Sequence, residues 1–168
     1  MKELVDIYNA QRQPTDKTVE RDSAFLHEGE YVLYVLGVIQ DAQGRYLAVQ
    51  RSPEKHWAPL SWEVPGGGVS AGETSAQAIV REIQEEVGLD VSALVAEPFF
   101  SYESVDLDRG DNYFVDMYRF TLDVSRSDIV LEESEAIDSA FVTWDEICAL
   151  AEQGLFLHFE RLRAALGL

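Results

Sequence analysis

Three glutamates, Glu82, Glu85 and Glu86, are spaced so that a helix would bring their carboxylates together. Residues three and four apart on a helix are surface neighbours, so the three side chains are expected to project into one small region. Carboxylates at this spacing repel one another, and the only cation close to them in the sequence is Arg81. Hard cations such as Mg²⁺ prefer such clusters of oxygen ligands, and they can acidify water and stabilise a departing oxygen. The spacing therefore indicates a divalent-cation site.

The helix that must carry these glutamates is predicted over residues 75–87. Thr74 is a suitable N-cap, and Gln77 three residues later completes a capping-box pattern. Gly88 is expected in the left-handed conformation that ends a helix, and Leu89 returns the chain to the core. The helix is expected to face a sheet through an apolar stripe at helical spacing: Ala76, Ile79, Val80, Ile83 and Val87.

Three consecutive glycines, Gly66, Gly67 and Gly68, lie between this helix and a short predicted strand at residues 62–64. A backbone without side chains can turn sharply and can approach an ion or a phosphate closely. Taken alone, the glycines would indicate only a turn. In front of an acidic helix, they predict a loop that helps to form a ligand site.

Residues 66–89, GGGVSAGETSAQAIVREIQEEVGL, resemble the signature of the Nudix hydrolases. That signature is Gly, five residues, Glu, seven residues, then Arg-Glu-aliphatic-x-Glu-Glu-x-Gly-aliphatic. The resemblance extends over about residues 31–166, although only the signature is specific, and it implies an α/β (α+β) fold, an α/β/α sandwich around a mixed sheet. Every specified position of the signature is matched here: Gly67, Glu73, Arg81, Glu82, Ile83, Glu85, Glu86, Gly88 and Leu89.

The same resemblance implies that Mg²⁺, with Mn²⁺ as an alternative, binds to Glu82, Glu85, Glu86 and the carbonyl of Gly66. It gives the catalytic proton transfer to one of these glutamates or to Glu135, which precedes a predicted strand at the spacing of an extra acid in some relatives. For Glu135, a solvated loop position is the alternative. Other acids between two predicted strands could serve instead, although each is more typical of a surface residue: Glu103, Asp106, Asp108 and Asp111.

Four further positions of the signature are expected to be structural: Gly67, Glu73, Arg81 and Gly88. In relatives, the acid and the arginine form an ion pair that joins the loop to the helix. An ion pair between Glu73 and Arg81 is therefore expected here.

Substrate recognition is less evident in the sequence. Arg51 could contact a phosphate, and Trp57, Phe100 and Tyr102, together with Phe99, could offer stacking surfaces. For the aromatic residues, ordinary core packing is the alternative.

The strand pattern predicts a mixed sheet with a hairpin formed by residues 31–39 and 46–50. An N-terminal extension, residues 1–30, is expected to form its own β-hairpin around a turn at residues 10–15, and residues 31–168 are expected to form the Nudix hydrolase domain. The remaining predicted elements are strands at 94–102, 112–122 and 140–143, and helices at 144–153 and from about 157.

The formal net charge of -18 excludes a general nucleic-acid binder, because the chain would repel phosphates. Cys148 is the single cysteine, so no intrachain disulfide can form. No segment is apolar enough for a signal peptide or a membrane span, and a cytoplasmic protein is expected.

Together these features predict a Mg²⁺-dependent hydrolase that cleaves the pyrophosphate bond of a small-molecule nucleoside diphosphate derivative. Two alternatives remain open: a noncatalytic sensor of a nucleotide metabolite, and an enzyme similar to isopentenyl diphosphate isomerase, which the N-terminal part resembles. The intact signature and the lack of a cysteine after the first strands speak against them. A homodimer is also expected, because the extra hairpin would otherwise expose strand edges.

Overall fold

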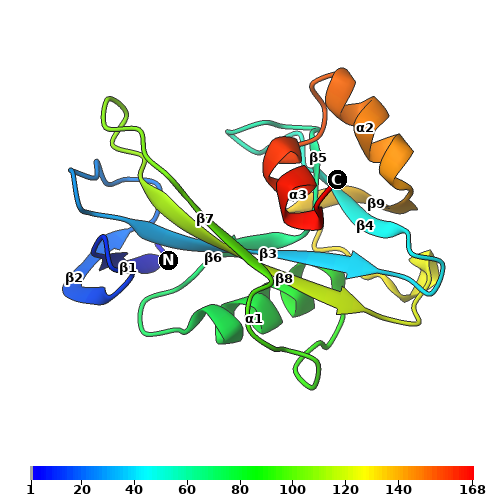
Figure 1. Ribbon diagram of the computed structural model, residues 1–168, viewed down its shortest axis with the longest axis horizontal. Coiled ribbons are helices and arrows are strands. Elements are labelled where there is room, and N and C mark those ends of the chain that lie inside the picture. The colour runs from blue at the N-terminus through cyan, green and yellow to red at the C-terminus, as the bar shows by residue number, and fades with distance from the viewer. Residues whose placement is uncertain (1) are drawn as a thin grey trace.

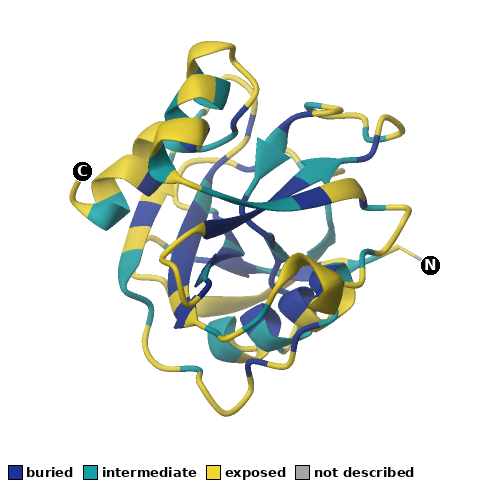
Figure 2. Cartoon of the chain, turned by 90° about the vertical axis from the view of Figure 1, so that its right-hand side faces the viewer, coloured by how far each residue is buried: buried dark blue, intermediate teal, exposed yellow. Residues whose placement is uncertain are grey.

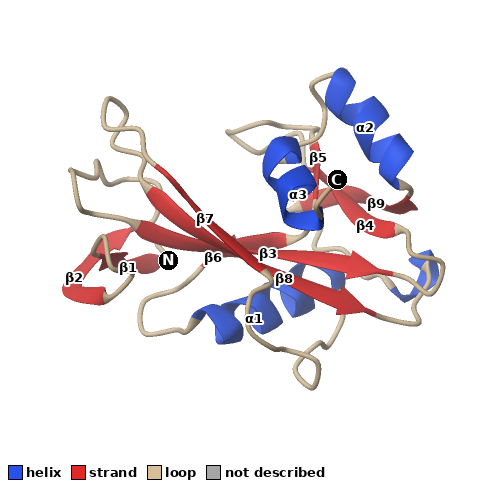
Figure 3. Cartoon of the chain, in the orientation of Figure 1, coloured by secondary structure: helices blue, strands red, loops and turns tan. Residues whose placement is uncertain are grey.

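A central strand with neighbours of both orientations organises the protein. In the computed structural model, residues 2–168 are described, and they form a seven-stranded mixed sheet and a two-stranded hairpin (Figures 1 and 3). The elements are β1 Leu4–Tyr8, β2 Pro14–Glu20, β3 Val32–Gln40, β4 Tyr46–Arg51, β5 Trp62–Glu63, β6 Gly66–Gly68, α1 Ser75–Val87, β7 Phe100–Ser104, β8 Tyr113–Thr121, the 3₁₀ helix η1 Arg126–Asp128, β9 Ala136–Val142, α2 Trp144–Glu152 and α3 Phe159–Leu166.

Strand β3, rich in β-branched and aromatic residues, pairs with β8 in parallel along its whole length and with β6 antiparallel. The predicted hairpin of β3 and β4 is present, but the two strands pair only where Gln40 faces Tyr46. Strand β4 then turns away and pairs with β9 and β5 instead. This divergence divides the sheet into two parts, one formed by β4, β5 and β9 and the other by β3, β6, β7 and β8.

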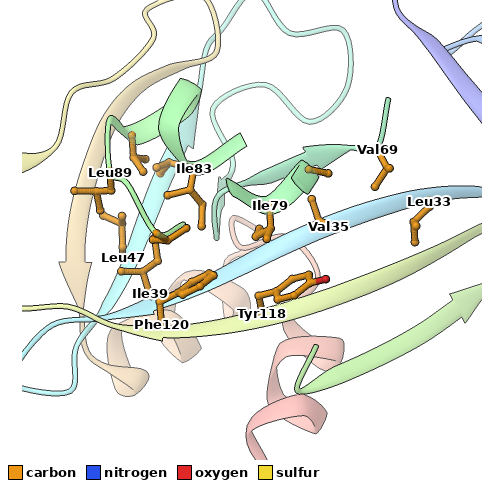
Figure 4. Packing of buried hydrophobic residues seen from close by; sticks show 14 of the residues in the cluster. Leu33, Val35, Ile39, Leu47, Val69, Ile79, Ile83, Leu89, Tyr118 and Phe120 are labelled. Atoms are coloured by element: carbon orange, nitrogen blue, oxygen red, sulfur yellow. The ribbon is translucent and has the colours of Figure 1, made fainter. Parts of the chain in front are cut away.

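The two faces of the sheet are covered by different helices, as expected for an α/β/α sandwich. Val35 and Ile39 of β3 pack toward α1, where Figure 4 shows them against Ile79 and Ile83. The alternate residues of β3, such as Leu36, belong to a second core that α2 and α3 complete. Figure 2 shows the burial concentrated on the central strands and the inner face of α1. Among residues 2–168, none of the helices combines the length and apolar character that a bilayer crossing requires.

The glycine segment differs from the loop predicted for it, because Gly66–Gly68 forms strand β6 and pairs with β3. A side chain at Gly66 would overlap the carbonyl oxygen of Val35, so the two backbones approach more closely than other residues would allow. The glycines therefore permit a close strand pairing and not a sharp bend.

Two predicted strands have different bounds in the structure, and the apolar stripe of α1 contains a different alanine. The strand predicted at 94–102 begins only at Phe100, since Pro98 lacks the N–H group that a ladder needs. The strand predicted at 140–143 begins earlier, at Ala136, because it pairs along β4. On α1, Ala78 is fully buried whereas Ala76 is only partly buried, so the apolar stripe is rotated slightly.

The N-terminal hairpin was predicted correctly, and it docks on the start of β3. Strands β1 and β2 pair antiparallel, and Tyr8 exchanges two backbone hydrogen bonds with Tyr31, of 2.8 and 3.0 Å. Val5 and Ile7 of β1 are buried. The hairpin therefore shares buried surface with the rest of the fold.

A buried aspartate on β8 joins three segments that are distant in the sequence. Asp116 is 3% exposed and accepts hydrogen bonds of 2.6 Å from each of Arg12, Ser75 and Ser101. These donors come from the hairpin turn, the first residue of α1 and β7. Because a buried carboxylate is stable only when it is paired and hydrogen-bonded, this cluster fixes the hairpin to α1 and the sheet.

Replacing Asp116→Ala is expected to lower the free energy of unfolding by roughly 3 kcal/mol, since it leaves an arginine and two hydroxyls without their shared acceptor. Arg12→Ala is expected to have a smaller effect, because the Arg12 side chain is 39% exposed and Asp116 keeps two donors. Urea denaturation measures both. Equal losses for the two variants would show that the aspartate does not act as a common anchor.

Candidate active site

Helix α1 has defined ends, as its sequence predicts. The Thr74 hydroxyl accepts from Gln77 N and the Gln77 side chain accepts from Thr74 N, so the capping box is complete. Gly88 adopts φ 72°, and its N–H donates to Gln84 O at 3.1 Å. These caps fix the start and end of the helix, and therefore the side from which each glutamate projects.

Arg81 connects the glycine strand, the following loop and α1. Its Nε and Nη2 donate to the two oxygens of Glu73 at 2.8 and 2.9 Å, so the expected ion pair is present and bidentate. Nη2 also donates to Gly68 O at 3.0 Å, and Nη1 donates to Glu82 Oε1 at 2.8 Å. Burial acts to raise the pKa of Glu73, but hydrogen bonds from Arg81 and Ser70 outweigh it and lower that pKa. Glu73 is thus a stable anion within a rigid clamp.

The side chain of Glu82 points from α1 to the glycine strand. A methyl group on Gly67 would overlap the Glu82 carboxylate, so the strand can pass there only as glycine. Glu82 is 7% exposed, and burial raises its pKa although Arg81 opposes the shift. Gly67 therefore provides the space that a buried carboxylate occupies.

Glu86 lies one turn further along α1, again on the side of the glycine strand. Its only protein hydrogen bond among residues 2–168 comes from Gly66 N, at 3.3 Å. Burial raises its pKa well above the ordinary value, and the charges of Glu82 and Glu63 raise it further. Glu85 differs from both, because its side chain is 53% exposed and contacts Arg81 at 3.3 Å. The structure therefore brings Glu82 and Glu86 together at the glycines and leaves Glu85 at the rim.

Glu63 was not among the residues singled out from the sequence, yet it belongs to this acidic group. It forms an ion pair of 2.8 Å with Arg51, and both side chains are 16% exposed. Burial raises the pKa of Glu63 despite this partner, and the charge of Glu63 acts on Glu86. A charged residue between Trp62 and Val64 in a predicted strand was the one sequence signal that could have indicated it.

Glu135, the predicted later acid, lies just before β9 and forms an ion pair with Lys55. Its side chain is 38% exposed, and its charge contributes to the raised pKa values of both Glu63 and Glu86. Lys55 was also missed in the sequence. Glu135 is therefore within electrostatic range of the acidic group while remaining open to solvent.

The other predicted acids lie elsewhere. Glu103 is on β7, and Asp106, Asp108 and Asp111 lie in the connection from β7 to β8. Asp106 accepts from Arg109 N at 3.1 Å, which stabilises that turn. Their charges are absent from the main influences on Glu82 and Glu86.

The proposed substrate-binding residues form two separate pairs. Arg51 donates to the Trp57 carbonyl at 3.0 and 3.2 Å, and its guanidinium lies 5.3 Å from the Trp57 ring centroid; Trp57 as a whole is 58% exposed. Tyr102, by contrast, is 8% exposed beneath Arg161, and Phe100 packs against the same core. In the first pair Trp57 is accessible and the Arg51 side chain is largely covered beside Glu63, whereas the second pair is mainly part of the packing under α3.

Within residues 2–168, no three acidic, histidine or cysteine side chains form a ready-made metal cage. The oxygen donors of Glu82 and Glu86 nevertheless fit a hard divalent cation, because they are two crowded carboxylates with raised pKa values and no cation is among the main influences on Glu86. The chemistry of this donor set is thus consistent with the cation that the sequence indicates.

Comparisons with known proteins agree with this geometry. The NUDIX domain model matches residues 30–162. An uncharacterized Nudix hydrolase of Listeria monocytogenes is 34% identical over 155 residues, which cover 92% of this chain and 88% of the relative. An 8-oxo-dGTP diphosphatase of Proteus vulgaris is 43% identical over 56 residues, 33% of this chain and 49% of that protein.

Solved structures show the same fold. A Deinococcus radiodurans protein superposes with a TM-score of 0.74 at 23% identity, covering 91% of both chains. A bifunctional NMN adenylyltransferase/ADP ribose pyrophosphatase of Francisella tularensis, complexed with AMP and a Mn ion, superposes with a TM-score of 0.63 at 22% identity, covering 82% of this chain and 41% of that one.

The fold and the glutamate site thus define an enzyme that acts on pyrophosphate bonds, a class that generally uses divalent metal ions. The chain belongs to the Nudix hydrolase family.

Replacing Glu86→Gln is expected to stabilise the metal-free protein by roughly 1–3 kcal/mol at neutral pH, because it removes a partly buried charge that faces other carboxylates. A carboxyl with a raised folded-state pKa makes the wild type lose stability as pH rises from about 4.5 toward that pKa, whereas the glutamine variant lacks this loss. Urea denaturation in a chelator across this pH range measures the difference. Glu85→Gln is the exposed control, and a Glu86→Gln variant no more stable than the wild type at pH 7 would contradict the account.

Proposed function

We propose that this protein is a Mg²⁺-dependent hydrolase that cleaves the pyrophosphate bond of a nucleoside diphosphate linked to another group. The observation that carries the proposal is the pairing of Glu82 and Glu86 against the glycine strand, with both pKa values raised by burial. Such a site is incomplete without a cation. The names of relatives, an 8-oxo-dGTP diphosphatase and an ADP ribose pyrophosphatase, support a small nucleotide substrate.

Glu82 and Glu86, together with the Gly66 carbonyl, would hold Mg²⁺, and Mn²⁺ suits the same oxygen donors. Glu85 would contribute from the rim. The cation would supply charge neutralisation for the pyrophosphate and acidification of water. With a net charge of -18, the protein itself repels a polyphosphate, so compensation of charge at the site is especially important.

Glu135 is our preferred general base, because it is open to solvent and close enough to influence Glu86 and Glu63. In the reaction, the water oxygen forms a bond to phosphorus, its proton passes to Glu135, and the bond from phosphorus to the bridging oxygen breaks. Lys55 orients the base through their ion pair. The clamp of Arg81 and Glu73 keeps the glycine strand at a fixed distance from α1 and does not contact the substrate.

Arg51 and Trp57 are the residues that we propose for contact with the nucleotide. The Trp57 ring is exposed and lies beside the guanidinium of Arg51, which offers a stacking surface next to a positive charge. Phe100 and Tyr102 would act beneath this region through packing.

The cytoplasmic location and the homodimer stay predictions. The open outer edge of β2, which pairs only with β1 among residues 2–168, supports self-association. Light scattering at micromolar concentration distinguishes a dimer from a monomer.

The proposal is tested by assaying a panel of ADP-ribose, nucleotide sugars, dinucleotides and 8-oxo-dGTP with Mg²⁺ and with a chelator. Glu82→Gln and Glu86→Gln are expected to lower kcat by about 10²-fold or more, since each removes a charged oxygen donor at the site of charge development. Glu85→Gln is expected to lower it less, because that side chain is exposed. Glu152→Gln, on the exposed side of α2, is the control.

Hydrolysis that persists in the chelator, or that survives Glu86→Gln, would contradict the proposed mechanism. Tight nucleotide binding without hydrolysis of any compound would instead favour the noncatalytic sensor.

A further inference from the structure

Lys55 lies on the loop from β4 to β5, and backbone contacts place it beside Glu135. Arg51 at the end of β4 pairs with Ala136 at the start of β9. Directly after this pair, Ser52 N donates to Glu135 O at 3.0 Å, and Lys55 N donates to Ser52 O at 3.2 Å. Ser52 is 3% exposed, so the loop starts from a buried position. The ion pair between Lys55 and Glu135 is therefore a consequence of the strand pairing and not of a chance surface contact.

The other end of the same loop is held as well. Arg51 Nε and Nη2 both donate to the carbonyl oxygen of Trp57, at 3.2 and 3.0 Å. Lys55 is thus located between two fixed points, Ser52 and Trp57. A cation on an anchored loop loses little conformational freedom when a ligand binds to it, which favours binding.

The ammonium of Lys55 lies within electrostatic range of the acidic group. Its charge acts to lower the pKa of Glu63, although burial outweighs this effect and the pKa is raised. The charge of its partner, Glu135, acts on both Glu63 and Glu86. Lys55 therefore borders the same site as the glutamates that are proposed to hold the cation.

The cations that contact carboxylates of this group differ in how much of their hydrogen-bonding capacity is already used. Arg81 donates to three carboxylates and to a backbone carbonyl. Arg51 donates three hydrogen bonds, and its side chain is 16% exposed. The Lys55 ammonium, in contrast, donates only to Glu135 among residues 2–168, and its side chain is 27% exposed. Because an ammonium has three N–H groups, Lys55 keeps donors for a further acceptor.

A phosphate oxygen is the acceptor that this position suits. The neighbouring side chains are carboxylates, so an incoming phosphate meets repulsion that a nearby ammonium offsets. Lysine binds phosphate as a point charge, and its donors can rotate to serve two acceptors at once. A lysine that holds both the base and the phosphate would keep these two groups in the relative position that attack by water requires.

We propose that Lys55 contacts a phosphate of the pyrophosphate group while it remains paired with Glu135, and so connects the substrate to the base. The inference rests on the proposed function and adds a substrate-binding residue to it. If Lys55 only oriented Glu135, its removal would slow the reaction without changing the affinity for a diphosphate.

The test is calorimetric binding of inorganic imidodiphosphate to the full chain in saturating Mg²⁺, because this diphosphate analogue lacks the bridging oxygen that hydrolysis requires. Lys55→Met, which keeps most of the aliphatic stem, is expected to weaken binding by about tenfold or more, since a charge-assisted hydrogen bond is lost. Lys55→Arg is expected to bind within about threefold of the wild type, because it keeps the charge. Lys17→Met, which removes a cation paired with Glu30 on the N-terminal hairpin, is the matched control and is expected to bind as the wild type does.

Glu135→Gln separates a direct contact from an effect through the base. This variant is expected to bind imidodiphosphate at least as tightly as the wild type, because it leaves Lys55 in place and removes a negative charge. The proposal is overturned if Lys55→Met binds as the wild type does, if Lys55→Arg is as weak as Lys55→Met, or if Glu135→Gln loses as much affinity as Lys55→Met. Thermal unfolding shows whether each variant is folded, and Lys55→Gln replaces Lys55→Met if that variant is not.

Hydrolysis by the wild type distinguishes this inference from the proposed function. Hydrolysis of pyrophosphate compounds, together with imidodiphosphate binding that does not depend on Lys55, would overturn the inference alone. Binding that depends on Lys55, without hydrolysis of any compound, would overturn the hydrolase and leave the phosphate contact standing.

Discussion

The bidentate ion pair between Arg81 and Glu73 is the interaction on which the site depends. It ties the loop after β6 to α1, and the same guanidinium also holds the Gly68 carbonyl and the Glu82 carboxylate. One side chain thus sets the distance between the glycine strand and the acidic helix. The caps at Thr74 and Gly88 fix the helix itself, so that the clamp acts between two rigid parts.

This rigid frame holds an arrangement that is electrostatically unfavourable without a cation. Glu82, Glu86 and Glu63 have raised pKa values because they are crowded and partly or fully buried. Arg81 contacts Glu82 and Arg51 contacts Glu63, but both arginines are also engaged elsewhere. The fold therefore carries a local loss of stability at the place where the chemistry is proposed. A divalent cation bound to these carboxylates would offset their mutual repulsion. Because such a ligand binds only the folded state, it would stabilise the folded protein.

The parts that could be predicted from the sequence are those with local causes. The capping box at Thr74, the left-handed Gly88 and the spacing of the glutamates follow from neighbours within a few residues, and α1 appears with the predicted bounds. The N-terminal hairpin was likewise predicted, from two possible short strands around a polar turn. The family resemblance supplied the sandwich and the expected partner of Arg81.

What the sequence did not predict depends on contacts between distant segments. The pairing of Gly66–Gly68 with β3, the approach of Glu63 to Glu86, and the anchoring of Arg12 by Asp116 all form only when the sheet assembles. Helical spacing also placed Glu85 in the same small region, yet its side chain lies at the rim, because α1 presents Glu82 and Glu86 to the glycines.

The most direct test of the central claim is the affinity for Mn²⁺, measured by calorimetry on the wild type and on Glu73→Gln. Glu73 is 15% exposed in its side chain and bonds to Arg81 and Ser70, so it acts on the site only through the clamp. If the clamp positions Glu82 and Glu86, then Glu73→Gln weakens Mn²⁺ binding by about tenfold or more in a protein that remains folded. Unchanged Mn²⁺ affinity in that variant would contradict the account.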